Sequence, residues 1–324
     1  MTDLAIEASG LRKVFGDDVI AVDGVDLAVR EHEIFGFLGP NGAGKSTTAR
    51  ILTTLLRPTE GTASVAGLDV LHHPNDVRKI IGVALQEVGL DALATGRELI
   101  LLQAYLHGFS TAESKRRADE VLEIVGLTEA ADRRVGTYSG GMKRRLDLAN
   151  ALIHSPLVLF LDEPTTGLDP ASRQAIWDEV ARLNREEGIA VFLTTQYLEE
   201  ADRLADRVSI IDRGRIVAMG TPQELKSSIG TDVITVSVDG ERIADARAAL
   251  ASLDGLADVQ LEADRLTLFV SSGSSAVADV IRLLDQARVD VGPVAVSHAT
   301  LDDVFLKATG SRLEGASTDG EGDG

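Results

Sequence analysis

The pattern of apolar and polar positions predicts two structural parts that meet near residue 228. In the first part, short continuous apolar runs are typical of buried strands. The predicted strands are residues 33–38, 157–163 and 189–195. Segments with apolar residues at helical spacing predict helices between them, at residues 46–56, 95–108 and 111–125. Thr95, followed three residues later by Glu98, forms a capping box at the start of the second helix.

The pattern changes in the second part, at residues 229–309. Strand-like alternation at 234–238 and 266–270 is followed in each case by helical spacing, at 243–253 and 277–284. A last helix begins at Thr300. We predict a small α+β domain of about 80 residues and of ferredoxin-like type. It has no catalytic cluster, so we expect a dimerising or regulatory role, with simple protection of the first part as the alternative. Residues 310–324 form an acidic tail that we expect to be disordered.

Composition excludes several classes of function. The 324 residues, 44% of them apolar, are enough for one large domain and a smaller one. No apolar run approaches the 18 or so residues of a membrane span, and the N-terminus lacks a signal-peptide pattern, so we expect a cytoplasmic protein. The chain has no cysteine, and its six histidines show no metal-ligand spacing. A net charge of −19 argues against a nucleic-acid partner.

Residues 39–47, Gly-Pro-Asn-Gly-Ala-Gly-Lys-Ser-Thr, match the phosphate-binding loop pattern G-x-x-x-x-G-K-[ST]. The glycines let backbone N–H groups approach phosphates, Lys45 supplies an ammonium near the β- and γ-phosphates, and Ser46 supplies a hydroxyl to Mg²⁺. The predicted strand before the loop and helix after it have the required order, and the helix adds its positive dipole end. A glycine-rich turn is the alternative for the motif taken alone.

Two further segments carry candidate chemistry. The strand 157–163 ends in Asp162 and Glu163, placed to support Mg²⁺ and to orient an attacking water, respectively. The alternative is an acidic turn before Pro164. Residues 138–142, Tyr-Ser-Gly-Gly-Met, precede a helix that Ser139 is placed to cap, which leaves backbone N–H groups open to an anion.

The phosphate loop, residues 138–142, the Asp162–Glu163 strand and Gly167-Leu168-Asp169-Pro170 follow the order of an ATP-binding-cassette (ABC) ATPase. The resemblance covers about residues 4–227. It implies an α/β fold, namely a P-loop NTPase cassette that occupies residues 1–228. This cassette would contain a mixed sheet core, an antiparallel β subdomain and a helical subdomain at about 87–155. The sequences of the segments Leu85–Asp91 and Thr194–Asp202 resemble those of the daunorubicin-resistance branch of drug exporters.

The resemblance implies a role for each site residue. Phe15 matches the aromatic that stacks on adenine, although a core phenylalanine at a strand end is the alternative. Glu163 and Gln196 match the catalytic pair. Residues implied to bind nucleotide are Phe15, Gly39, Asn41, Gly42, Gly44, Lys45, Ser46, Thr47 and Gln86. Those implied to hold Mg²⁺ are Ser46, Gln86 and, through water, Asp162. Those implied to reach a second copy are Ser139, Gly140, Gly141, Met142 and Asp169.

Two positions depart from the family pattern. Met142 stands where the signature has glutamine, and Gln196 stands where a histidine is expected. A glutamine amide donates a hydrogen bond but stays neutral, so hydrolysis is either slower or dependent on Glu163 alone. Because glutamine is familiar there in the drug-exporter branch, we interpret Gln196 as a feature of that branch.

The resemblance implies an ATP-hydrolysing subunit of an exporter of drugs or other hydrophobic compounds, with ATP and Mg²⁺. It would act as a homodimer on the inner face of the membrane, bound to a separately encoded permease. The apolar stretch 88–102 would then form the groove for the permease's coupling helix, with a plain core helix as the alternative. Two other functions remain open: a soluble ABC ATPase outside transport, and a non-hydrolysing regulatory module.

Overall fold

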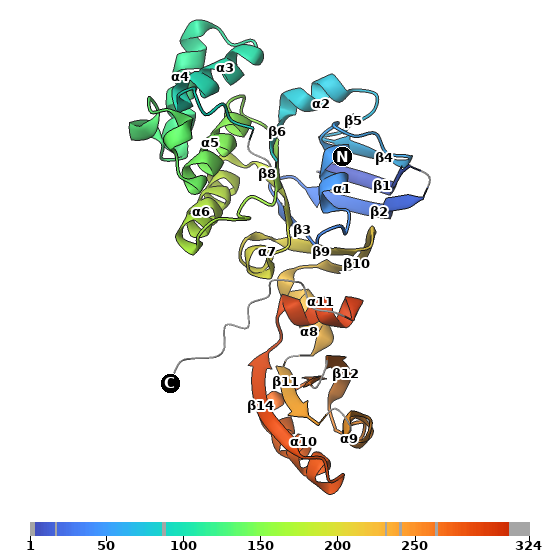
Figure 1. Cartoon of the computed structure of the whole chain (residues 1–324). Helices are drawn as coiled ribbons and strands as arrows, with labels where there is room; N and C mark the ends of the chain where they lie inside the picture. Colours follow the sequence, from blue (N-terminus) through green and yellow to red (C-terminus); the bar gives the residue numbers. More distant parts are fainter. Residues whose placement is uncertain are drawn as a thin grey trace. The chain divides into compact units, whose positions relative to one another are not determined.

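The computed structural model describes residues 4–310, except residues 17, 86–88, 231, 240–241 and 263–264. The predicted Gln86 site residue and all of the predicted tail except Gly310 lie outside this part. The chain divides into two compact units, Met1–Ile216 and Val217–Gly324 (Figure 1). The boundary that we expected from the sequence lay near residue 228. None of the described helices combines the length and apolar character that crossing a bilayer requires.

The first unit contains a six-stranded sheet with the order β10-β9-β3-β8-β7-β6. Its strands are β3 (Ile34–Leu38), β6 (Ile81–Ala84), β7 (Val158–Asp162), β8 (Ala190–Thr195), β9 (Arg207–Asp212) and β10 (Arg215–Gly220), of which β10 runs across the division between the units. The five strands from β9 to β6 are parallel. Parallel strands place their carboxyl ends at one edge, where ligands bind. The α/β fold class is confirmed.

Aromatic packing fixes the centre of this sheet. Phe192 on β8 lies 6.0, 5.5 and 5.6 Å, between ring centroids, from Phe35, Phe37 and Phe160 on the neighbouring strands. All four side chains are at most 2% exposed. Burial of these four rings stabilises the packing of the strands that lead to the candidate site.

Two further groups of elements flank the six-stranded sheet (Figure 1). One is an antiparallel sheet of order β2-β1-β4-β5, formed by β1 (Leu4–Phe15), β2 (Val19–Arg30), β4 (Glu60–Val65) and β5 (Leu68–Asp69). The other is a group of helices, α3 (Gly96–Leu106), α4 (Thr111–Ile124) and α5 (Gly140–Leu152), with 3₁₀ turns at Thr128–Ala130 and Val135–Thr137. The remaining helices of this unit are α1 (Lys45–Leu52), α2 (Pro74–Ile80), α6 (Pro170–Glu187) and α7 (Leu198–Leu204). The two flanking subdomains that the resemblance implied are therefore present.

Local predictions in this unit hold with one correction. Thr95 caps α3 in a capping box with Glu98, and Ser139 caps α5, as predicted. The helix predicted over 46–56 was wrong at its end, because α1 stops at Leu52. Thr54 has a φ of 64°, in the left-handed region, and the chain turns away there, which leaves Leu55 55% exposed.

The second unit contains a four-stranded antiparallel sheet of order β12-β13-β11-β14. Its elements are α8 (Pro222–Ile229), β11 (Asp232–Val238), α9 (Ile243–Leu250), β12 (Leu256–Glu262), β13 (Arg265–Val270), α10 (Gly273–Gln286), β14 (Val291–His298) and α11 (Leu301–Thr309). The βαββαβ order with this strand arrangement is ferredoxin-like, as predicted. The sequence reading missed β12 and β14. It found α11, which Thr300 and Asp303 cap as a box.

Candidate nucleotide-binding site

The phosphate loop connects β3 to α1 and is shaped by close packing of its glycines. Gly44 has a φ of 106°, and a Cβ added there would lie 2.3 Å from the carbonyl oxygen of Ala21. No other residue type fits that position without moving the backbone. Lys45 curls back over the loop, and its Nζ donates to the carbonyl oxygens of Gly39 (2.8 Å) and Pro40 (3.0 Å). The loop is thus already formed around the Lys45 ammonium.

The carboxylate of Glu163 pairs with this ammonium. The distance from Lys45 Nζ to Glu163 Oε1 is 3.2 Å, and the two side chains are only 4% and 5% exposed. Burial lowers the pKa of Lys45, while Glu163 and Asp162 oppose that change. The sequence placed both residues in one site, and the structure brings their charged groups into direct contact.

Asp162, the last residue of β7, lies against the first turn of α1. Its Oδ1 accepts hydrogen bonds from Ser46 Oγ (3.0 Å) and from Thr194 Oγ1 on β8 (2.5 Å). A hydroxyl and a buried carboxylate beside a phosphate loop are hard oxygen ligands of the kind Mg²⁺ takes together with nucleotide phosphates. The donor set therefore fits this ion.

Gln196 and Phe15 lie at strand ends. Gln196 follows Thr195, the last residue of β8, whose carbonyl oxygen accepts a 3.2 Å hydrogen bond from the Gly39 N–H. This backbone contact places Gln196 next to the start of the phosphate loop. Phe15 ends β1 and is 42% exposed, so the alternative that it is a core residue was wrong. Its ring lies 5.2 Å from Lys13 Nζ.

The segment 139–142 lies at the start of α5, where Ser139 Oγ accepts from the Met142 N–H (3.2 Å). Gly141 packs closely against α6, since an added Cβ would lie 2.8 Å from Ser172 Oγ. Asp169 caps α6 by accepting from the Ser172 N–H (3.0 Å). Among the described residues of one chain, no hydrogen bond joins 139–142 to the phosphate loop. A single chain therefore assembles the loop with Asp162 and Glu163 but leaves residues 139–142 apart.

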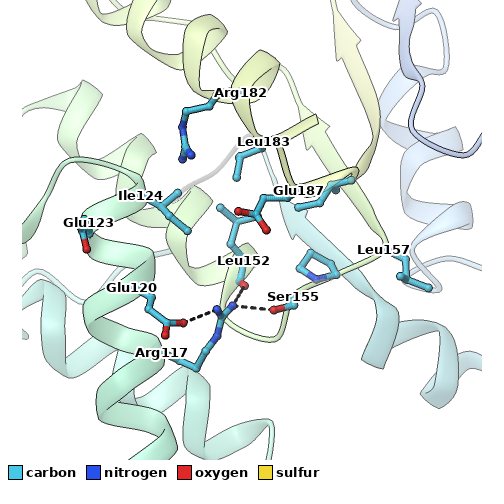
Figure 2. Close-up of a pocket in the computed structure, with 12 residues that line it drawn as sticks. Arg117, Glu120, Glu123, Ile124, Leu152, Ser155, Leu157, Arg182, Leu183 and Glu187 are labelled. Atoms are coloured by element: carbon cyan, nitrogen blue, oxygen red, sulfur yellow. Dashed lines mark hydrogen bonds and ion pairs between the residues drawn. The ribbon is translucent and has the colours of Figure 1, made fainter. Parts of the chain in front are cut away.

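Two hollows lie on the first unit away from the phosphate loop. We call one the β6 groove; it has a volume of about 490 Å³, and its lining includes Leu55, Val83, Leu90, His107, Asp147 and His154. The second, the α4–α6 hollow, has a volume of about 750 Å³ and is lined by residues of α4, α6 and the segment after α5. Figure 2 shows Arg117 in this hollow, bonded to the Leu152 carbonyl (3.0 Å), Ser155 (2.9 Å) and Glu120 (2.8 Å).

The sequence reading missed two residues that contact the acidic strand end, Thr194 and Arg144. This arginine of α5 is 6% exposed and contacts the backbone on both sides of Glu163. A charged residue on a helix is normally expected to face water, so its type alone carries no signal. The available signal was its position two residues after Met142, within the stretch that carries the buried stripe of the helix.

Comparisons with known proteins agree with this geometry. The ABC transporter family matches residues 22–166, and the C-terminal domain family of DrrA1-3-like ATP-binding proteins matches residues 220–309. The doxorubicin resistance ATP-binding protein DrrA of Mycobacterium tuberculosis (strain ATCC 25618 / H37Rv) is 45% identical over 95% of this chain and 94% of that protein. The daunorubicin/doxorubicin resistance ATP-binding protein DrrA of Streptomyces peucetius is 44% identical over 97% of this chain and 95% of that protein.

Among solved structures, the dimeric ATP-binding cassette MJ0796 bound to ADP and phosphate has a TM-score of 0.61 and 27% identity to this chain. The match covers 67% of this chain and 98% of that one. The similarity to the DrrA proteins extends through both units, and the site contains the phosphate loop and acidic strand end of an ATPase. The chain therefore belongs to the ATP-binding subunits of ABC transporters, in the DrrA-like family of ATPases.

Proposed function

We propose that this chain hydrolyses ATP to drive export of drugs or other hydrophobic compounds through a separate permease. The observation that carries the proposal is the pairing of Lys45 with Glu163 and of Ser46 with Asp162. It occurs in a chain 44–46% identical to proteins named for daunorubicin or doxorubicin resistance. Membership of the ABC transporter family shows that the chain is an ATPase. The names of its relatives support drugs as the class of exported compound.

Lys45 and Glu163 exchange partners when ATP binds. The ammonium that pairs with Glu163 is the group that a phosphate loop offers to the β- and γ-phosphates. Once Lys45 contacts phosphate oxygens, the Glu163 carboxylate is released to orient the attacking water and to accept its proton. Buried at the loop, both charges act in a medium of low dielectric, which strengthens each contact.

Ser46 and Asp162 are the residues that would hold Mg²⁺, with Asp162 acting through water and Gln86 as a further ligand. When bound, Mg²⁺ neutralises charge that develops on the phosphate oxygens. Thr194 keeps the Asp162 carboxylate in place through its 2.5 Å hydrogen bond. Gln196 contacts the γ-phosphate as a neutral donor, and Phe15 stacks on adenine with its exposed ring.

Two copies of the chain form two complete sites. Among the described residues of one chain, no hydrogen bond joins residues 139–142 to the phosphate loop. Their backbone N–H groups at the start of α5 can instead donate to an anion, such as a phosphate held by a second copy of the chain. We propose that Ser139, Gly140, Gly141 and Met142 of one copy face the γ-phosphate held by the other copy, with Asp169 between the copies. The dimeric state of the cassette MJ0796 supports this arrangement.

The β6 groove is the proposed docking site of the permease, which would hold the chain at the inner face of the membrane. Leu55 in its lining is 55% exposed, and Leu102 and Leu106 on α3 are 55% and 73% exposed. Apolar side chains exposed next to a groove are typical of a surface that receives a helix. Within the stretch 88–102 itself, Ile100 is buried and Leu99 and Leu101 pack against the core, so the alternative of a plain core helix stays open there.

Drug accumulation in cells tests this proposal. Cells that express the chain with its permease should accumulate less daunorubicin than cells with the Lys45→Ala chain, because that change removes the phosphate-binding ammonium. The same cells should show drug-stimulated ATP hydrolysis in membrane vesicles. Equal accumulation, with ATP hydrolysis intact, would refute this cargo class but leave the ATPase in place.

A further inference from the structure

Arg144 connects three separate segments of the catalytic unit. From the second turn of α5, its Nε donates to the Pro164 carbonyl oxygen (2.9 Å) and its Nη2 to that of Asp162 (3.0 Å). Its Nη1 donates to the Leu85 carbonyl oxygen (2.5 Å), just after β6. A planar guanidinium can hold several acceptors in fixed directions at once, which a lysine ammonium on a flexible stem cannot. One buried side chain thus fixes the chain before and after Glu163.

The backbone at Glu163 needs such support. Glu163 has a φ of 49°, in the left-handed region that side chains other than glycine rarely adopt, and it precedes a proline. A strained conformation persists only where its surroundings fix it. Two sets of hydrogen bonds do so here. The Glu163 N–H donates to the Thr194 carbonyl (3.0 Å) and hydroxyl (3.1 Å), and Arg144 holds the carbonyls on either side.

Asp147, one turn further along α5, links Arg144 to the β6 groove. Its Oδ2 lies 3.4 Å from Arg144 Nη1, and its side chain, 17% exposed, lines the groove. Burial raises the pKa of Asp147 to about 6 despite the opposing effect of Arg144. An occupant of the groove would contact Asp147 and, through it, the guanidinium that holds Glu163.

We propose that Arg144 is a positioning residue for ATP hydrolysis, which holds Glu163 in its strained conformation and connects that conformation to the β6 groove through Asp147. The proposal rests on the proposed role of Glu163. It explains how a helix that begins with the segment 139–142 also controls the carboxylate of its own chain. It also gives a physical path from the permease-docking surface to the reacting water.

Arg144→Lys tests the proposal, and the chain offers a matched control in Arg117→Lys. Arg117 also donates to backbone carbonyls, those of Leu152 and Ile153, and pairs with a glutamate, but it lies in the α4–α6 hollow (Figure 2). Each variant keeps the positive charge and loses the planar fork. In the full-length chain, Arg144→Lys should lower kcat about 100-fold, the effect expected of a misplaced catalytic group. The ATP Kd should fall by no more than the about three- to tenfold expected when the Glu163 carboxylate no longer competes for Lys45, since the phosphate loop itself is untouched.

The single tryptophan provides a readout that does not depend on turnover. Trp177 Nε1 and Thr165 Oγ1 both donate to the buried Glu200 Oε1, at 2.8 and 2.9 Å, and Thr165 follows Pro164. Arg144→Lys should therefore shift Trp177 emission in the nucleotide-free chain, and Arg117→Lys should not. Asp147→Asn leaves Arg144 in place but replaces its carboxylate partner with a neutral amide. This variant should shift the emission in the same direction and lower kcat, by less than Arg144→Lys does.

The outcomes separate this proposal from the proposed function. A kcat for Arg144→Lys within about twofold of that for Arg117→Lys would overturn the positioning role. If Arg144→Lys does not fold, an Asp147→Asn chain with unchanged kcat and emission would overturn it instead. If Glu163→Gln leaves turnover intact, the assignment of Glu163 fails. If Glu163→Gln abolishes turnover and Arg144→Lys does not reduce it, only the positioning proposal fails.

Discussion

Replacement of Glu163 by glutamine should change ATP binding and ATP hydrolysis in opposite directions. Lys45 is held by Glu163 at 3.2 Å as well as by the carbonyls of Gly39 and Pro40. ATP must compete with that carboxylate for the ammonium. A neutral amide of the same shape removes the competing charge, while Asp162 still opposes the lowering of the Lys45 pKa. ATP affinity should therefore rise about three- to tenfold, which corresponds to about 0.7–1.4 kcal/mol.

The same change removes the proposed proton acceptor. General bases contribute about 10²–10⁴-fold to rate, so kcat should fall by a factor in that range, or about 3–5 kcal/mol of transition-state free energy. The exposed Glu186, which pairs with Arg182 on α6, provides a control, since Glu186→Gln should change neither quantity. Titration calorimetry gives the ATP Kd, and phosphate release gives kcat. Unchanged kcat would refute the role of Glu163, whereas lost turnover with weaker binding would refute the partner exchange.

Two further predictions concern the β6 groove. Leu55→Glu should lower permease-stimulated ATP hydrolysis about tenfold or more without changing the melting temperature, because Leu55 is exposed in the proposed docking surface. Leu157 is similarly exposed but lies in the α4–α6 hollow, so Leu157→Glu should have no effect. Equal effects of the two substitutions would contradict the docking site. The His154 ring stacks on that of His107, with 4.1 Å between the ring centroids, and burial lowers the pKa of His154 to about 4. Because the unfolded chain binds this proton more readily than the folded chain, the free energy of unfolding should decrease as the pH falls from about 6.5 to about 4. After allowance for solvent screening, thermal melts should show about 1 kcal/mol less pH-dependent loss between pH 7 and pH 5 in His154→Gln than in the natural chain, and identical pH dependence would contradict the neutral buried histidine.

The sequence predicted the parts of the fold that follow from local patterns. Continuous apolar runs identified the strands that become β3, β7 and β8, because buried parallel strands have no polar face. Capping residues such as Thr95 and Thr300 marked helix starts through hydrogen bonds made within one turn. Gly292 and Pro293 interrupt β14, whose other positions are mostly exposed, so its strand pattern was hidden.

The sequence also placed the phosphate loop near Asp162 and Glu163, but it did not reveal how these groups meet. The Lys45–Glu163 pair depends on the register between β3, β8 and β7, which sets the strand ends level. The role of Arg144 depends on packing of α5 against the segments after β6 and β7, which no local pattern records. The left-handed backbone at Glu163 is likewise a product of tertiary contacts. Motifs therefore predict the chemistry of a site, and packing determines its geometry.

We expect two copies of this chain to complete each other's ATPase sites. Lys45→Ala inactivates the phosphate loop, and Gly140→Asp places a carboxylate at the start of α5. A Cβ at Gly140 meets only Leu168 at an ordinary 3.5 Å, so this variant should fold. Each variant alone should be inactive. A heterodimer isolated through two different affinity tags contains one site built from two intact halves.

ATP hydrolysis by that heterodimer is the most direct test. We expect about half the activity of the natural dimer if the two sites act independently. A heterodimer as inactive as either parent, with both variants folded and dimeric, would contradict this expectation.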